Sequence, residues 1–130
     1  MVRILLVDDD AAVLETLRTG LLAAGHEVVG VADGMQAIAA VRDAGFDLVI
    51  TDIVMPNADG IETILKLRRL QPDLPLIAMS GGGRAGTGDY LAIAAKFGAA
   101  ATLAKPFSPR QLAKVVAGVL AGAKAAARPE

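Results

Sequence analysis

The fold of this 130-residue chain is decided by the stretch Asp47-Leu48-Val49-Ile50-Thr51-Asp52-Ile53-Val54-Met55-Pro56. Its apolar run at 47–51 is short and continuous, which is typical of a strand buried on both faces. Similar runs occur at 2–7, 28–31, 76–79 and 99–104. Apolar residues at helical spacing lie around 13–21, 61–65, 90–97 and 112–120. Alternation of strand and helix predicts an α/β fold: a doubly wound, five-stranded parallel sheet with helices on both faces.

Local signals mark where the helices begin and end. Asp10 is expected to cap the first helix. Three further starts carry a side-chain acceptor followed three residues later by Gln or Glu: Asp33 with Gln36, Asp59 with Glu62, and Ser108 with Gln111. Glycines that suit left-handed caps follow three helical runs, at Gly25, Gly45 and Gly98.

Composition narrows the classes of function. The chain has 13 Lys and Arg against 14 Asp and Glu, a net charge of -1, so we expect no direct binding of nucleic acid. The absence of cysteine excludes disulfides, thiolate metal sites and cysteine nucleophiles. No charge-free apolar stretch approaches the ~20 residues that span a bilayer, and no signal peptide is indicated. We therefore expect a cytoplasmic protein without membrane insertion, with one domain at 1–122 and an Ala-rich tail at 123–130.

Polar residues follow the predicted strands. In an open parallel sheet, ligands bind at the carboxyl ends of the strands. Those positions hold the residues Asp8, Asp9, Asp52, Ser80 and Lys105. Three converging carboxylates need a cation, and hard oxygen ligands favour Mg²⁺ or Mn²⁺. The Ser80 hydroxyl and the Lys105 ammonium could donate to a phosphoryl group beside that metal.

The chain resembles a receiver domain of the two-component response regulators, with the flavodoxin-like (βα)5 fold, across essentially its whole length. The resemblance rests on five motifs in order: Ile4-Leu5-Leu6-Val7-Asp8-Asp9, the stretch 47–56 quoted above, Asp59-Gly60, Ala78-Met79-Ser80 and Lys105-Pro106-Phe107. Each motif alone is common, whereas five in this order are specific to the family.

The resemblance implies a role for each site residue. Asp52 would accept a phosphoryl group from a histidine kinase, a phosphotransfer protein or a small phosphodonor. The metal would be held by Asp8, Asp9, Asp52 and the backbone carbonyl of Val54. Ser80 and Lys105 would contact the phosphoryl oxygens and pass the signal to the fourth helix, fifth strand and fifth helix. The Lys105–Pro106 peptide is expected to be cis.

The resemblance also implies how the domain is used. It would be a switch and not an enzyme, apart from its own phosphorylation and slow dephosphorylation. A downstream protein effector would recognise the altered surface, and the domain would be a monomer or a weak, phosphorylation-dependent dimer.

Two features depart from the family pattern. Thr102 occupies the position of the usual switch aromatic, so another group such as Tyr90 or Phe97 would have to replace it. The loop 81–88 is glycine-rich and longer than is typical, and we expect contact between phosphate and Ser80 to order it. Val54 and Gly82 offer no polar side chain to position an attacking water, which predicts a long-lived phosphorylated form.

Two other classes of protein would use some of the same residues. An aspartyl phosphatase of the haloacid-dehalogenase type would use Asp8 as its nucleophile, but the further acidic pair expected after Lys105 is missing. A nucleotide-binding module would use Gly81–Gly86, which matches G-x-G-x-x-G but lacks the acidic residue that holds a ribose. The single histidine, His26, is interpreted as a turn residue.

Overall fold

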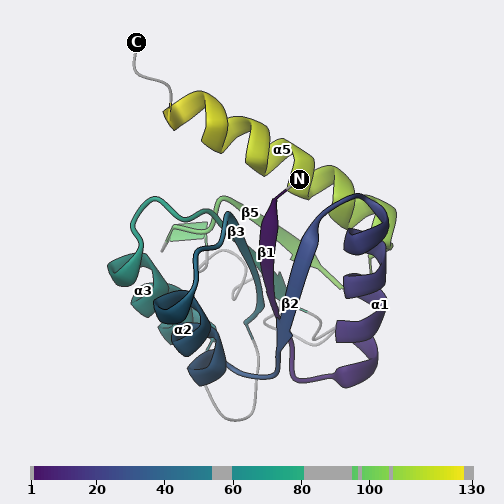
Figure 1. The fold of residues 1–130 in the computed structure, drawn as a ribbon, viewed down its shortest axis with the longest axis horizontal. Helices are drawn as coiled ribbons and strands as arrows, with labels where there is room; N and C mark the ends of the chain where they lie inside the picture. Colours follow the sequence, from purple (N-terminus) through teal and green to yellow (C-terminus); the bar gives the residue numbers. More distant parts are fainter. Residues whose placement is uncertain (1, 54–59, 81–94, 97, 106, 128–130) are drawn as a thin grey trace.

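Parallel strands form one sheet in the order β2-β1-β3-β4-β5 (Figure 1). The computed structural model describes residues 2–53, 60–80, 95–96, 98–105 and 107–127. The strands are β1 (Arg3–Val7), β2 (Glu27–Val31), β3 (Leu48–Asp52), β4 (Leu76–Ser80) and β5 (Ala101–Ala104). All four neighbouring pairs are parallel, with Leu5 opposite both Val29 and Val49, and Ser80 opposite Ala104. The predicted sheet is confirmed.

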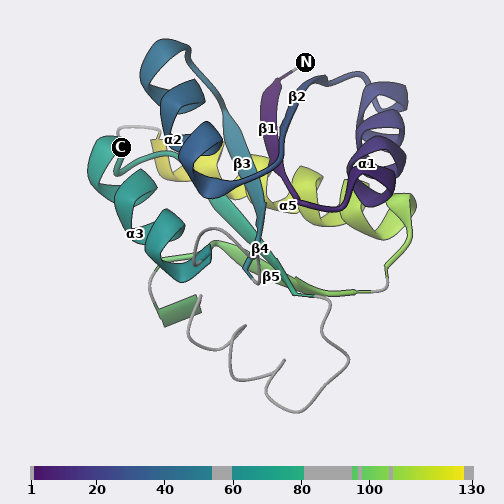
Figure 2. The ribbon, with the colours of Figure 1, turned by 90° about the horizontal axis from the view of Figure 1, so that it is seen from below.

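Helices cover both faces of this sheet. They are α1 (Ala11–Ala23), α2 (Gly34–Asp43), α3 (Gly60–Leu70) and α5 (Pro109–Ala127). Helices α1 and α5 lie on one face and α2 and α3 on the other (Figure 2). The helix expected at 90–97 falls mostly outside the described residues, although 95 and 96 are helical. Within the described chain, no helix combines the length and apolar character required to traverse a lipid bilayer.

The core has two halves because successive side chains of a strand point to opposite faces. Toward α2 and α3 the buried residues are Leu5, Val7, Ala37, Val41, Val49, Ile53, Ile64, Leu67, Leu74, Leu76 and Ala78. Toward α1 and α5 they are Ile4, Leu6, Leu17, Leu21, Val28, Leu48, Ile50, Ile77, Met79, Leu112 and Val116. Strands β1, β3 and β4 contribute to both halves, as continuous apolar runs predict.

The predicted helix starts are confirmed where the structure describes them. Asp10 Oδ1 accepts hydrogen bonds from the amides of residues 12 and 13, at 3.0 and 3.2 Å. Asp33 Oδ1 accepts from the Gln36 amide at 2.8 Å. Ser108 and Gln111 bond reciprocally, at 2.7 and 3.1 Å. Asp59, the remaining cap, lies outside the described residues.

The glycine caps are confirmed at two positions and wrong at the third. Gly25 and Gly98 have φ angles of +95° and +108°. Gly45 has no positive φ. The reason is that α2 ends one residue earlier, where Ala44 adopts extended backbone with φ -148° and ψ 157°. An extended residue redirects the chain without a left-handed turn. Helix α5 continues to Ala127, and the division of the chain at residue 122 stays a prediction.

Candidate functional site

The predicted site residues lie at the carboxyl end of the sheet. Asp8 follows β1 directly, Asp52 ends β3, Ser80 ends β4 and Lys105 follows β5. Backbone hydrogen bonds extend the sheet past two of these ends. The Asp8 amide donates to the Val31 carbonyl at 3.1 Å, and the Lys105 amide donates to the Ser80 carbonyl at 2.8 Å. The sheet itself therefore fixes the backbone from which Asp8 and Lys105 project.

Strand alternation decides which side chains meet. Asp8 is in phase with Leu6, and Asp52 is in phase with Ile50, so both belong to the α1–α5 side of the sheet. Lys105 is in phase with Leu103, which packs against the same half of the core. Three residues from distant parts of the chain thus converge on one side of the strand ends.

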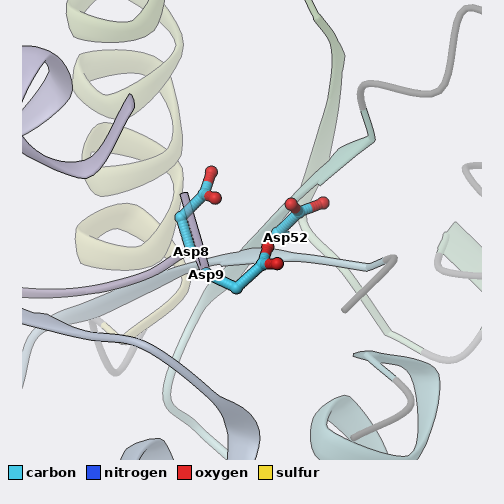
Figure 3. A group of neighbouring side chains, drawn as sticks. All are labelled: Asp8, Asp9 and Asp52. Atoms are coloured by element: carbon cyan, nitrogen blue, oxygen red, sulfur yellow. The ribbon is translucent and has the colours of Figure 1, made fainter. Parts of the chain in front are cut away.

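The carboxylates of Asp8, Asp9 and Asp52 form one cluster (Figure 3). Each contributes an oxygen, and these oxygens lie within 4.8 Å of one another. Asp8 is 1% exposed and Asp52 is 6% exposed, whereas Asp9 is exposed to solvent. The cluster is therefore buried on one side and open on the other, which allows entry of an ion or a substrate group.

Lys105 bridges the two buried carboxylates. Its Nζ donates to Asp8 Oδ2 at 2.6 Å and to Asp52 Oδ2 at 3.2 Å. Burial of the ammonium acts to lower the pKa of Lys105, but the hydrogen bond to Asp8 and the negative charges of Asp52 and Asp8 outweigh it. The pKa of Lys105 consequently lies above its ordinary value of 10.5. The lysine is a permanent cation at neutral pH.

The three consecutive aspartates, Asp8, Asp9 and Asp10, make different contacts. Asp8 Oδ1 accepts a hydrogen bond from the Asp10 amide at 2.9 Å, while its Oδ2 is bound by Lys105. Asp10 turns away to cap α1. Asp9 adds an exposed carboxylate to the cluster. Only the first two of the three can therefore serve a shared site.

These residues suit a hard divalent cation. Mg²⁺ prefers oxygen ligands and is commonly held by one or two carboxylates together with phosphate oxygens. The described cluster supplies carboxylate oxygens from Asp8, Asp9 and Asp52, without a competing nitrogen or sulfur ligand among them. Val54, whose backbone carbonyl was predicted to complete the ligands, lies outside the described residues.

The side chains of Ser80 and Thr102 belong to the α2–α3 side of the sheet, Ser80 at the end of β4 and Thr102 within β5. Ser80 is in phase with Ala78 and Thr102 is opposite Ala78, away from the phase of Lys105. Ser80 is fully buried, and within the described residues its Oγ has no hydrogen-bond partner. A buried hydroxyl without a partner is costly, so this atom is available to a ligand oxygen.

Other predictions concern residues outside those described. These are the Gly81–Gly86 loop with its extension to 88, Tyr90, Phe97 and the peptide before Pro106. A further feature, which was not predicted from the sequence, is an apolar pocket of about 330 Å³ beside Lys105. Phe107, Val13 and Leu17 line it. Phe107 belongs to the Lys105-Pro106-Phe107 motif, and its position next to Lys105 in the sequence is the signal from which an apolar surface beside the lysine could have been predicted.

Comparisons with known proteins agree with this geometry. The family described as response regulator receiver domain matches residues 4–117. Response regulator protein FleR of Pseudomonas aeruginosa is 38% identical over 115 residues, which are 88% of this chain and 24% of that protein. The DNA-binding transcriptional regulator NtrC of Azospirillum brasilense is 37% identical over 113 residues, 87% of this chain and 23% of that protein.

A solved structure of a receiver domain also matches the fold of this chain. The CheY-like response regulator receiver domain protein from Methanospirillum hungatei superimposes with a TM-score of 0.86 at 29% identity. The match covers 95% of this chain and 97% of that one. The chain thus equals a single solved domain in extent, while it spans about a quarter of the length of the two curated relatives.

Proposed function

Because this chain belongs to the response regulator receiver domain family, we propose that it is a phosphorylation-controlled switch that accepts a phosphoryl group on Asp52. The observation that carries the proposal is the meeting of Asp52, Asp8 and Lys105 at the strand ends. In the proposed reaction the Asp52 carboxylate is the nucleophile, Lys105 is the adjacent cation, and oxygens of Asp8 and Asp9 would hold a metal beside it. This arrangement suits a group that brings several negative charges.

The proposed transfer is a displacement at phosphorus. An Asp52 carboxylate oxygen forms a bond to phosphorus while the bond from phosphorus to a histidine nitrogen of the donor breaks, and the electron pair stays on that nitrogen. Mg²⁺, when bound, neutralises charge on the phosphoryl oxygens. Asp8 and Asp9 would hold the metal beside Asp52, and Lys105 would stabilise the charge that develops on the transferred group.

Lys105 and Ser80 are proposed to sense the product. Phosphorylation of Asp52 changes the partner of the Lys105 ammonium from a carboxylate to a phosphoryl oxygen. The Ser80 hydroxyl, which has no hydrogen-bond partner among the described residues, would donate a hydrogen bond to the same group from the α2–α3 side of the sheet. With Thr102 in place of an aromatic, we propose that movement of Ser80 and the loop after it changes the surface around β5 and α5.

We propose that catalysis by this domain is limited to its own switch. Water would attack phosphorus, the bond from phosphorus to Asp52 would break, and inorganic phosphate would leave. The phosphatase alternative requires nucleophilic attack by Asp8, whose two oxygens are bound by the Asp10 amide and Lys105. Membership of the receiver family also favours Asp52 over Asp8 as the acceptor.

The partners are proposed from the same family membership. A sensor histidine kinase or a histidine phosphotransfer protein would supply the phosphoryl group in the cytoplasm. The relative NtrC is a DNA-binding transcriptional regulator by name, and we propose that this receiver likewise controls an effector. The domain would act as a monomer or as a weak dimer formed on phosphorylation.

The proposal is tested by treating the protein with acetyl phosphate and Mg²⁺ and measuring intact mass. Wild type should gain one phosphoryl group, and fragmentation should place it on Asp52. Asp52→Asn should gain none, while the matched surface variant Asp43→Asn should behave as wild type. Label on Asp8 together with turnover of phosphoesters would support the phosphatase instead.

A further inference from the structure

Helices α2 and α3 lie side by side (Figures 1 and 2). Side chains of both helices line a groove of about 520 Å³ on the molecular surface. Met35, Ile38 and Leu70 form its apolar part. Met35 is 75% exposed and Leu70 is 38% exposed. Single exposed apolar residues are ordinary on protein surfaces. Met35 and Leu70, however, share one groove with Ile38, and such a grouping indicates a binding surface. We call this the α2–α3 groove.

Basic side chains border the same groove. Arg42, Lys66 and Arg69 line it, and no acidic residue does so among the described residues. Lys66 pairs with Glu62 at 3.3 Å, but both side chains are mostly exposed, so this pair is weak. Neither arginine forms an ion pair with another described residue. The groove therefore combines an apolar centre with a net positive rim on a chain whose total charge is -1.

We propose that the α2–α3 groove binds an acidic amphipathic helix of a partner protein. The face of α2 from Met35 to Arg42 rises about 10 Å, or two helical turns, which matches a short docked helix. Apolar side chains of that helix at i and i+4 would contact Met35 and Leu70. Glu or Asp beside them would pair with Arg42 and Arg69, whose guanidinium groups bind carboxylates in two places at once.

Charge and shape favour a helix of this kind over other occupants. A membrane surface recognises clusters of four to eight basic residues, roughly, whereas this groove has three and is concave. Met35 adds a flexible side chain that adapts to different apolar partners. None of the lining residues belongs to the Asp52 site, so this inference goes beyond the proposed switch.

The test uses stapled three-turn helical peptides with Leu at i and i+4, flanked by Glu or, in matched peptides, by Lys. Fluorescence anisotropy with the whole chain should show binding of the Glu peptides, and at least tenfold weaker binding of the Lys peptides. Amide chemical shifts should change along α2 and α3. Arg69→Glu should weaken binding about tenfold, while Arg110→Glu, a matched exposed arginine on α5, should leave it unchanged.

Several results would overturn the inference. Absence of binding by every Glu peptide at millimolar concentration is one, and equal binding of Glu and Lys peptides is another. Shift changes confined to other helices would place the site elsewhere. Association with vesicles of anionic phospholipid that is lost in Arg69→Glu would assign the groove to a membrane. Self-association that is lost in Arg69→Glu would assign it to a second copy of this chain.

Discussion

Replacement of Lys105 by Met tests the central contact of the site. The substitution keeps an unbranched side chain that is one atom shorter, and it removes the ammonium group with its charge. The two buried carboxylates of Asp8 and Asp52 then lie close together without the Lys105 ammonium between them. At an effective dielectric constant of about 20, the pairs at 2.6 and 3.2 Å are attracted by roughly 6 and 5 kcal/mol respectively.

The net loss is smaller than these attractions, because wild type also bears the cost of burying the ammonium. The Lys105 side chain is 19% exposed, which reduces both contributions. Breaking a buried pair by removing one partner costs about 3 to 5 kcal/mol. Since this pair is partly exposed, we expect Lys105→Met to lower the free energy of unfolding by about 3 kcal/mol without divalent metal.

Urea unfolding followed by circular dichroism, with EDTA and with millimolar Mg²⁺, measures this effect. Mg²⁺ should stabilise Lys105→Met more than wild type, because the metal replaces the missing positive charge beside Asp8 and Asp52. Lys114→Met, which removes an exposed lysine of α5, is the matched control and should change little. Equal stability of Lys105→Met and wild type in EDTA, or an equal response to Mg²⁺, would refute the reasoning.

Three further predictions concern stability. Gly20→Ala should lower the free energy of unfolding by about 1 to 2 kcal/mol, because the added Cβ would lie 2.7 Å from the Cβ of Pro109 and push α1 away from α5. An unchanged melting temperature would contradict this prediction. Gly98→Ala should lower the free energy of unfolding by about 2 kcal/mol, because φ is +108° and the added Cβ would approach Arg68 Nε to 2.8 Å. Urea unfolding measures this change, and a variant more stable than wild type would show that the position is not strained. The raised pKa of Lys105 means that its contribution to the free energy of unfolding is complete below pH 10.5 and is lost as the pH rises through the higher pKa of the folded state. The difference in stability between wild type and Lys105→Met should therefore shrink only above pH 10.5. A difference that shrinks already at neutral pH would argue against this ion pair.

The order of elements and the positions of the site residues followed from the sequence alone. Continuous apolar runs predicted the strands, because β1, β3 and β4 are almost entirely buried and such strands are mostly apolar on both faces. The edge strands β2 and β5 are more exposed than their apolar runs predicted. The caps at Asp10 and Ser108 were also predicted, since a capping bond spans only two or three residues. Gly45 shows the limit of such local signals, because glycine permits a positive φ without requiring one.

The identity of the Lys105 partners depended on the tertiary structure. In the sequence, Lys105 lies 97 residues from Asp8 and 53 from Asp52, and no local pattern says which acid it reaches. Strand order and alternation bring both carboxylates to its side of the sheet. The α2–α3 groove likewise exists only because two helices pack side by side on one face. Sequence determines which groups reach the strand ends, whereas the packing of the sheet and helices decides which of them meet.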